Sequence, residues 1–329
     1  MNADLDNWLA AVDFAMSVGE PAVAGDLIGA AAAACFDGFR AGEVDLVLNS
    51  VFASVERPAA RLLITGAFND ISTGNHVRLV ERTRAALQTG IEDKDRPCEA
   101  LARIYVAYST ATIDPTAACH SSELAVTGAE QTGDDDLLAL ALAWAGAVSF
   151  IADERETALD QLHRSIELTS GRDSLAAMHA HMGLYFVALE SDAQDPASHL
   201  SAVVDQTHAP GHAMSASVFW AFLDARSGDV DAVERVLDQA VRYFRDHGVA
   251  NSVADATLAA AETLQQGGDN AGAGRVMAAL HRQAFTTPFV YHRYRKLRDM
   301  VPERDRPPHR LDPGQVYDIA RQGLESLRG

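Results

Sequence analysis

The chain has 329 residues, of which 48% are hydrophobic but only 7% aromatic, and it carries a formal net charge of −19. So acidic a chain is poorly suited to non-specific binding of nucleic acid or of an anionic membrane, because both select basic surfaces. Its apolar residues are mainly Ala, Leu and Val, and Ala and Leu are strong helix formers. We therefore expect an all-α protein.

Cysteine content and apolar runs bear on the compartment. Cys35, Cys98 and Cys119 are too few and too scattered for a disulfide framework or a zinc site. The N-terminus holds acidic residues where a signal peptide needs a basic region. The longest apolar run, Val23 to Phe36, falls short of the roughly 20 residues that a membrane-spanning helix needs. We expect a cytoplasmic protein with reduced thiols.

Turn signals recur along the chain, each followed by apolar residues at three- and four-residue spacing. They lie about 32 to 42 residues apart, which leaves room for two helices and two short turns in each interval. This period predicts an α-solenoid of antiparallel helix pairs. In chain order the signals are GEVDLVL at Gly42, GNHVRLV at Gly74, DPTAACH at Asp114, DERETAL at Asp153, DPASHLS at Asp195, GDVDAVE at Gly228 and GDNAGAG at Gly268.

The pair predicted over residues 134–170 shows how such helices would pack. Gly146 and Ala158 lie on either side of its tight turn, so antiparallel helices would bring these small residues face to face. Leu142 and Leu162 would fill the layers around them. We expect a close backbone approach at Gly146.

The same pair resembles a tetratricopeptide repeat, whose consensus has Leu-Gly in the first helix and Ala-x-x-x-Phe in the second. Ala145-Gly146 and Ala158-x-x-x-Leu162 occupy those places, and Met182-Gly183 echoes the first helix. Repeat lengths vary, however, and Trp220 stands where a small residue is expected. The resemblance implies a degenerate tetratricopeptide-like superhelix.

The most densely spaced metal-ligand candidates are Asp205, His208 and His212, with His199 upstream. Pro210-Gly211 separates the two later histidines, so a polar loop between repeats is the favoured interpretation, and we expect no metal and no cofactor. His179 and His181 are two residues apart and point to nearly opposite sides of a helix, so they cannot chelate together.

In arrays of this kind the first helix of each pair usually lines the concave face, where polar and aromatic side chains suit a peptide or small ligand. The alternative is that most of these aromatic residues are core. The candidates for a groove that binds a partner are Arg61, Asn69, Arg103, Tyr105, Tyr108, Trp144, His179, Tyr185, Trp220 and Asp224.

From Phe289 onward the chain is mildly basic, with nine Lys or Arg against six Asp or Glu. This tail combines a basic and aromatic helix, a Pro-rich linker and a last helix over residues 314–327 that would cap the stack. We expect a helical-repeat array over residues 1–288 and this terminal segment over residues 289–329.

Both ends of the chain resemble the helical-repeat region of large bacterial signalling ATPases, which include actinobacterial LuxR-type transcriptional regulators and cyclase–ATPase fusions. At the N-terminus, DNWLAAVDFA from Asp6 to Ala15 is similar to an opening motif of the form acidic-Asn-Leu-x-x-Ala-Leu-x-Trp-Ala, with Trp8 for the first Leu and Phe14 for the Trp. At the C-terminus, LDPGQVYDIARQGLESL is similar to the closing helix.

The parts that define those regulators are missing from this sequence. No Gly-Lys pair occurs, which excludes a G-x-x-x-x-G-K-[ST] phosphate loop, and no helix-turn-helix is recognisable. The chain is then either an excised or split regulatory region or a stand-alone relative. No motif supports catalysis, so an enzyme on a helical scaffold is disfavoured.

The resemblance implies a non-catalytic regulatory or sensor module that binds a protein partner or a small ligand in transcriptional or signalling control. The alternative is a free-standing adaptor that binds a peptide. Neither interpretation involves direct contact with nucleic acid or a membrane, and an adjacent ATPase or regulator gene would favour the first.

Overall fold

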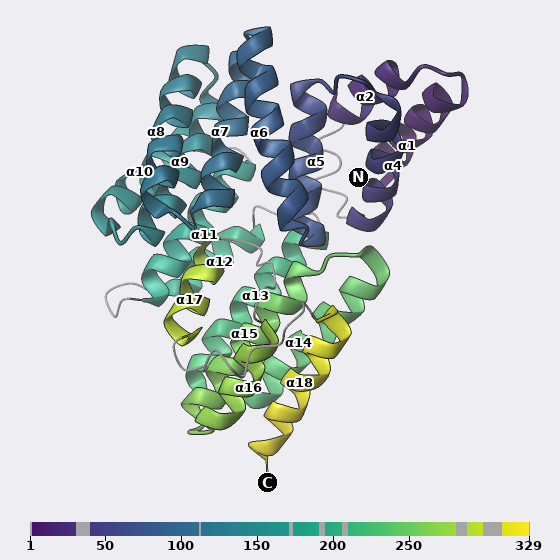
Figure 1. Ribbon diagram of the computed structural model, residues 1–329. Coiled ribbons are helices and arrows are strands. Elements are labelled where there is room, and N and C mark those ends of the chain that lie inside the picture. Colours follow the sequence, from purple (N-terminus) through teal and green to yellow (C-terminus); the bar gives the residue numbers. More distant parts are fainter. Residues whose placement is uncertain are drawn as a thin grey trace. The chain divides into compact units, whose positions relative to one another are not determined.

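The computed structural model is all-α, as predicted, and over the residues that it describes it contains helices and no strand (Figure 1). None of these helices is both long and apolar enough to span a bilayer. Part of the Pro-rich linker expected in the tail lies outside the described residues. The structure describes residues 2–30, 40–111, 113–170, 174–190, 195–205, 210–280, 288–298 and 311–328.

The chain divides into two compact units. The first consists of Met1–Asp70 and Asn75–Pro210, and the second of Ile71–Gly74 and Gly211–Gly329. The earlier helices are α1 (Asn2–Ser17), α2 (Pro21–Ala30), α4 (Ala41–Ser54), α5 (Ala60–Thr73), α6 (His76–Asp93), α7 (Arg96–Thr110), α8 (Pro115–Thr132), α9 (Asp135–Ile151), α10 (Arg155–Leu168), α11 (Leu175–Leu189) and α12 (Pro196–Asp205). The later helices are α13 (Pro210–Ser227), α14 (Val230–His247), α15 (Asn251–Gln266), α16 (Asn270–Leu280), α17 (Pro288–Arg298) and α18 (Pro313–Ser326).

Six of the seven turn signals precede an even-numbered helix from α6 to α16, which is the second helix of a pair, and the signal at Gly42 begins one residue inside α4. Aspartate side chains cap several of these helices by accepting a backbone hydrogen bond two or three residues on. Asp114 accepts from the amide of Ala117 at 3.0 Å, and Asp229 accepts from that of Ala232 at 2.9 Å. Gly228, with a φ of 76°, supplies the left-handed turn before Asp229. Most of the recurring signals are therefore inter-helix turns that carry their own cap, whereas α4 and α10 begin without a side-chain cap.

Within the first unit, α7 packs on α8, α9 on α10 and α11 on α12, which gives the expected antiparallel pairs. The first helices of these pairs also pack on one another, α7 on α9 and α9 on α11, and so form one continuous layer. The pair of α9 and α10 is joined by hydrogen bonds, including one of 3.0 Å from Ser149 Oγ to Gln161 Oε1. This first-helix layer, defined as α7, α9 and α11, holds most of the predicted groove residues.

The predicted close approach at Gly146 is present. A Cβ placed on Gly146 would lie 2.7 Å from Leu162 Cγ and 3.1 Å from the carbonyl oxygen of Ala158. Leu162 and Ala158 are both fully buried on α10. The backbone of α9 therefore sits against α10 with no room for a side chain at this position.

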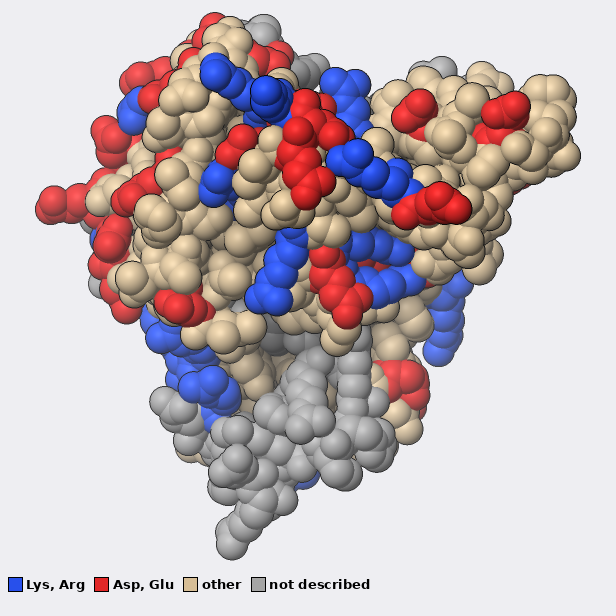
Figure 2. Space-filling view, turned by 45° about the horizontal axis from the view of Figure 1, so that its top comes forward, with Lys and Arg blue, Asp and Glu red and all other residues tan. Residues whose placement is uncertain are grey.

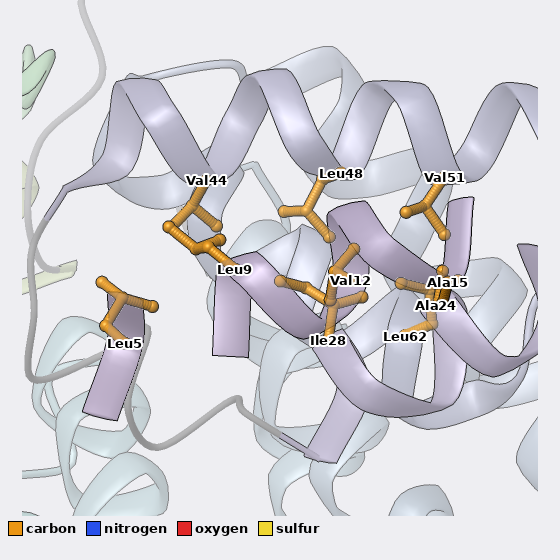
Figure 3. Close-up of a cluster of buried hydrophobic side chains, with 10 residues drawn as sticks. All are labelled: Leu5, Leu9, Val12, Ala15, Ala24, Ile28, Val44, Leu48, Val51 and Leu62. Atoms are coloured by element: carbon orange, nitrogen blue, oxygen red, sulfur yellow. The ribbon is translucent and has the colours of Figure 1, made fainter. Parts of the chain in front are cut away.

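The N-terminal helices of the first unit share a small core of their own (Figure 3). Apolar side chains of α1 meet those of α2 and α4, and Leu62 of α5 closes the cluster. The buried members are Leu5, Leu9, Val12, Ala15, Ala24, Ile28, Val44, Leu48, Val51 and Leu62. Only one side of α1 is used in this way, which leaves its opposite side outward.

In the second unit, α15 packs on both α14 and α16, and its side chains are buried from Asn251 to Leu264. The last helix, α18, packs on all three, and Tyr317 Oη donates a hydrogen bond of 2.7 Å to Asp238 of α14. Arg293 Nε of α17 donates one of 2.9 Å to the Glu262 carboxylate of α15. The tail helices α17 and α18 are thus integral to this unit.

Candidate functional site

The first-helix layer contains a stack of three rings, one from each helix. The Tyr108 ring of α7 meets the Trp144 ring of α9 edge-on, with centroids 5.2 Å apart. On its other side, Trp144 packs on the His179 imidazole of α11, with centroids 4.7 Å apart. At these separations two rings attract one another, and this attraction adds to the stabilisation that comes from burying their surface. Three of the predicted groove residues are therefore brought together.

The members of this ring stack differ in their exposure. Tyr108 and Trp144 are nearly covered, with 8% of Trp144 accessible, whereas His179 is half-buried. Tyr105, almost one turn before Tyr108, is also buried, and desolvation raises the pKa of its phenol far above the usual value. A binding partner would thus meet the stack first at the His179 end.

Two further candidates lie in the same layer but play different parts. Arg103 of α7 is half-buried and its Nη2 donates a hydrogen bond of 2.8 Å to Glu99 one turn earlier. Tyr185 of α11 is fully buried and packs edge-on against Phe186, with centroids 4.9 Å apart. Tyr185 therefore belongs to the interior, as the alternative interpretation of the aromatic residues foresaw.

The remaining candidates lie outside the first-helix layer, on α5 and α13. Arg61 is exposed on α5, while Asn69 is buried there and its Nδ2 donates a hydrogen bond of 3.4 Å to Asp45 of α4. Trp220 and Asp224 are half-buried on α13, in the second unit. Desolvation raises the pKa of Asp224, with Asp229 adding to the effect.

Beside Asn69 is a charge network that the sequence does not reveal. Asp70 of α5 has no exposed surface, and its carboxylate lies 2.9 Å from Arg78 Nε and 2.9 Å from Arg82 Nη1, both on α6. Arg78 also reaches Asp45 at 2.7 Å. Desolvation raises the pKa of Asp70 from 3.8 to about 6, and outweighs the two guanidinium groups, which act in the opposite direction.

This network orders α4, α5 and α6, since each of its charged groups is engaged by another helix. Arg82 additionally lies over the Phe52 ring of α4, with its guanidinium carbon 4.3 Å from the centroid. A Cβ on Gly66 would come within 3.0 Å of both Arg82 and Phe52. Because the arginines are already committed to carboxylates, the network is better suited to fixing the helices than to binding an anion.

Histidines on three successive helices form a cluster, which is the second feature that no sequence motif predicts. His181 of α11 and His199 of α12 have ring centroids 5.9 Å apart, and His163 of α10 is close enough to act electrostatically on both. Desolvation, together with the neighbouring histidines, lowers the pKa of His181 and of His199. His179 and His181 serve different contacts, as their spacing predicts.

The described residues hold no group of three or more His, Cys, Asp or Glu placed to bind a metal ion. The weaker metal hypothesis for Asp205, His208 and His212 depends on residues outside the described part of the chain. Cys98 is buried, and desolvation raises the pKa of its thiol to about 11, so it is kept in the unreactive thiol form.

No protein-family model matches the chain. None of the curated proteins matches it by sequence. Among solved structures, the chain resembles a Rap protein complexed with Competence and Sporulation Factor, with a TM-score of 0.57 and 12% sequence identity. The match covers 89% of this chain and 75% of that one. At such low identity the likeness shows the fold alone, which is a tetratricopeptide-like helical-repeat array.

Proposed function

We propose that this chain is a non-catalytic regulatory module whose first-helix layer binds a protein or peptide partner, in transcriptional or signalling control. The observation that carries the proposal is the stack of Tyr108, Trp144 and His179, which continues across three successive helix pairs. A core requires apolar area but does not require one ring per repeat in unbroken contact. The ring contacts run from one repeat to the next and reach the surface at the half-buried His179, where an extended chain could bind.

The chemistry of the three rings also supports a binding role. Tyr and Trp combine large apolar faces with a single polar group, and such side chains are enriched where partners bind. His179 adds an imidazole that can donate or accept a hydrogen bond near neutral pH. The partner that fits is a segment with apolar side chains and exposed backbone polar groups.

The structural neighbour supports a binding role as well, because that Rap protein was solved in complex with Competence and Sporulation Factor. A scaffold of stacked helix pairs exposes an extended surface without itself supplying a catalytic constellation. The two lines of support are independent, since one rests on side chains of this chain and the other on the backbone.

Affinity capture from the native lysate tests the proposal, with the full chain as bait and a photo-crosslinking amino acid placed at His179. A matched bait carries the crosslinker at His163, which is exposed on the second helix of a pair. We expect a stoichiometric partner that crosslinks at position 179 and not at position 163. The affinity of the Trp144→Leu bait for this partner should fall about tenfold, or about 1.4 kcal/mol, because the His179 ring then loses the ring on which it packs.

Circular dichroism of each bait establishes that it is folded. Equal crosslinking at both positions, or full capture by folded Trp144→Leu bait, would place the partner elsewhere on the molecule. A wild-type bait that captures nothing but a small molecule, identified by mass spectrometry of the denatured complex, would favour the ligand-sensor form of the same module.

A further inference from the structure

The last helix of the first unit, α12, depends on its contact with α11. Within the described part of that unit, α11 is the only helix on which α12 packs closely. The helix is 10 residues long, and its buried side chains are Leu200 and Val203. In contrast, α11 itself packs on α9 and α10 as well. Whatever weakens the interface between α11 and α12 therefore acts directly on the position of α12.

Two histidine rings meet at this interface, one from each helix. The ring centroids of His181 on α11 and His199 on α12 lie 5.9 Å apart, with their planes inclined by 36°. Both side chains are half-buried, and the buried Nδ1 of His181 has no hydrogen-bond partner in the described part of the chain. A proton on this ring would thus have no acceptor at that atom to stabilise it. The interface suits two neutral imidazoles.

The charged groups that face the two rings offer little compensation for a proton. His163 of α10 acts on both rings, because its own proton would place a further positive charge beside them. Asp195 at the start of α12 favours a proton on His199. Desolvation is the larger effect, however, and lowers the pKa of both His181 and His199.

The other helices packed here contribute few charges. Helix α11 has no Asp, Glu, Lys or Arg, and α9 has only Asp135 and Asp136, both in its first turn. The remaining charged residues of α10 and α12 are all exposed to solvent, and are Arg155, Glu156, Asp160, Arg164, Glu167 and Asp205. The histidines are therefore the groups at this interface whose charge changes between about pH 5 and about pH 8.

We propose that α12 is a proton-controlled latch, which protonation of His181 and His199 releases from α11. At neutral pH both imidazoles are uncharged and pack against each other. As the pH falls, the first proton must be held in a desolvated position, and the second places like charges on two rings in contact. Release of α12 returns both rings to water and removes the repulsion. Acid therefore favours the released state.

Helix α11 connects this latch to the proposed partner site. His179 precedes His181 by two residues, points to nearly the opposite side of α11 and packs on Trp144. Release of α12 removes one of the three helices that pack around α11, so the His179 ring is held less firmly against Trp144. Acid should then weaken partner binding at His179. This consequence rests on the proposed function, whereas the latch itself does not.

Hydrogen exchange of the full chain, followed by mass spectrometry, tests the latch without a partner. Protection of the α12 amides is measured at about pH 7.5 and about pH 5.5, after correction for the intrinsic exchange rate at each pH. We expect protection of α12 to fall about tenfold at the lower pH, which corresponds to about 1.4 kcal/mol. Protection of α8, which carries none of these three histidines, should stay unchanged.

This pH range separates the histidines from ordinary carboxylates. In Figure 2 the left edge of the first unit, where α8 and α10 lie in Figure 1, shows mainly the red atoms of Asp and Glu. An exposed carboxyl group titrates near pH 4, so it stays ionised at both pH values. Asp70, with its pKa raised to about 6, does titrate in this range, but it belongs to the network of α4 to α6. Variants that keep Asp70 remove its effect from the comparison.

Matched variants identify the groups that titrate. His181→Phe combined with His199→Phe keeps two rings at the interface but neither can be protonated, so α12 protection should change less than about twofold between the two pH values. His120→Phe replaces a histidine on α8 whose side chain is 74% exposed, and this variant should respond to pH as wild type does. Circular dichroism at about pH 7.5 establishes that both variants are folded.

Three outcomes would overturn the latch. Protection of α12 that stays constant in wild type shows no release, and an equal fall in the double Phe variant assigns the release to other groups. A parallel fall in α8 shows that acid unfolds the first unit as a whole.

Crosslinking at position 179, repeated at both pH values, tests the link to the partner site. We expect weaker crosslinking at the lower pH in wild type and an unchanged yield in the double Phe variant. Equal yields in wild type at both pH values would refute the link, while hydrogen exchange still decides the latch. No crosslinked partner at either pH would count against the proposed function alone.

Discussion

The close approach of α9 to α10 can be tested by adding a single methyl group at Gly146. In Gly146→Ala the new Cβ would lie 2.7 Å from Leu162 Cγ, 2.9 Å from Leu162 Cδ2 and 3.1 Å from the carbonyl oxygen of Ala158. Separations below 3.0 Å cannot persist, so Leu162 or the backbone of α10 must move. Leu162 is fully buried, so any movement of its side chain must displace neighbouring atoms of the core.

Two effects of opposite sign determine the result. Overpacking a filled core costs about 1–3 kcal/mol. Replacing a helical glycine by alanine recovers about 1 kcal/mol of backbone entropy and helix propensity. The carbonyl of Ala158 belongs to the backbone and cannot relax by a rotamer change, which places the steric cost in the upper part of its range. We expect a net loss of about 1–2 kcal/mol in the free energy of unfolding.

Urea denaturation followed by tryptophan fluorescence measures this difference, with Gly128→Ala as the matched control. A Cβ on Gly128 in α8 would lie 3.6 Å from Ala100 Cβ, an ordinary contact, so that variant should be more stable than wild type by about 0.5–1 kcal/mol. In a Leu162→Ala background only the 3.1 Å approach to the Ala158 carbonyl remains, so Gly146→Ala should cost clearly less than it does in wild type. The reasoning is refuted if Gly146→Ala and Gly128→Ala are equally stable, or if Gly146→Ala costs the same with and without Leu162.

Three other expectations concern charge and nucleotide. Desolvation raises the pKa of Asp70 from 3.8 to about 6, so protonation of this carboxyl stabilises the folded state. This contribution to the free energy of unfolding is complete below pH 3.8 and is lost as the pH rises through about 6. The free energy of unfolding of Asp70→Asn, measured with urea relative to wild type, should therefore rise by up to about 3 kcal/mol between about pH 4 and about pH 7. A difference between the two proteins that does not change with pH would contradict this. Desolvation lowers the pKa of His181, so the folded state favours the neutral imidazole. The contribution of His181 to the free energy of unfolding is complete above the pKa of the unfolded chain, about 6.5, and is lost as the pH falls. His181→Phe should flatten the acid loss of stability, and an unaltered pH profile would exclude that cause. Calorimetry with magnesium-ATP should show no stoichiometric micromolar binding, because the chain has no phosphate loop and its acidic field repels a polyanion.

The helix pairs could be predicted from the sequence because the caps and turns that end one helix and begin the next are formed by residues close together in the chain. Asp114 and Asp229 cap a helix through amides only three residues away, and Gly228 adopts a left-handed conformation within the same turn. Such signals need no knowledge of distant contacts. The packing at Gly146 was also within reach, because its partner helix follows after one tight turn.

The charge network on α4 to α6 could not be predicted in the same way. Asp45, Asp70 and Arg78 are ordinary charged residues in amphipathic helices, and nothing in their spacing separates them from solvent-exposed neighbours. Their meeting depends on how three helices pack, since Asp45 and Arg78 are 33 positions apart in the chain. The pairing of His181 with His199 has the same origin, since it requires α12 to return along α11.

Aromatic residues show most clearly why residue type was an incomplete guide to the binding surface. Trp144 and Tyr185 were chosen because rings on first helices suit a ligand, yet 8% and none of their surface is accessible. Phe14 was considered only as part of a family motif, and it is 69% exposed. A first helix that packs on its own partner and on the first helices of both neighbouring pairs must be apolar all round, so large apolar side chains fill its interior positions whether or not a ligand binds. Exposure and residue type must therefore be combined, and in the first-helix layer the ring that meets both conditions is the half-buried His179, which is why the binding test is placed at that residue.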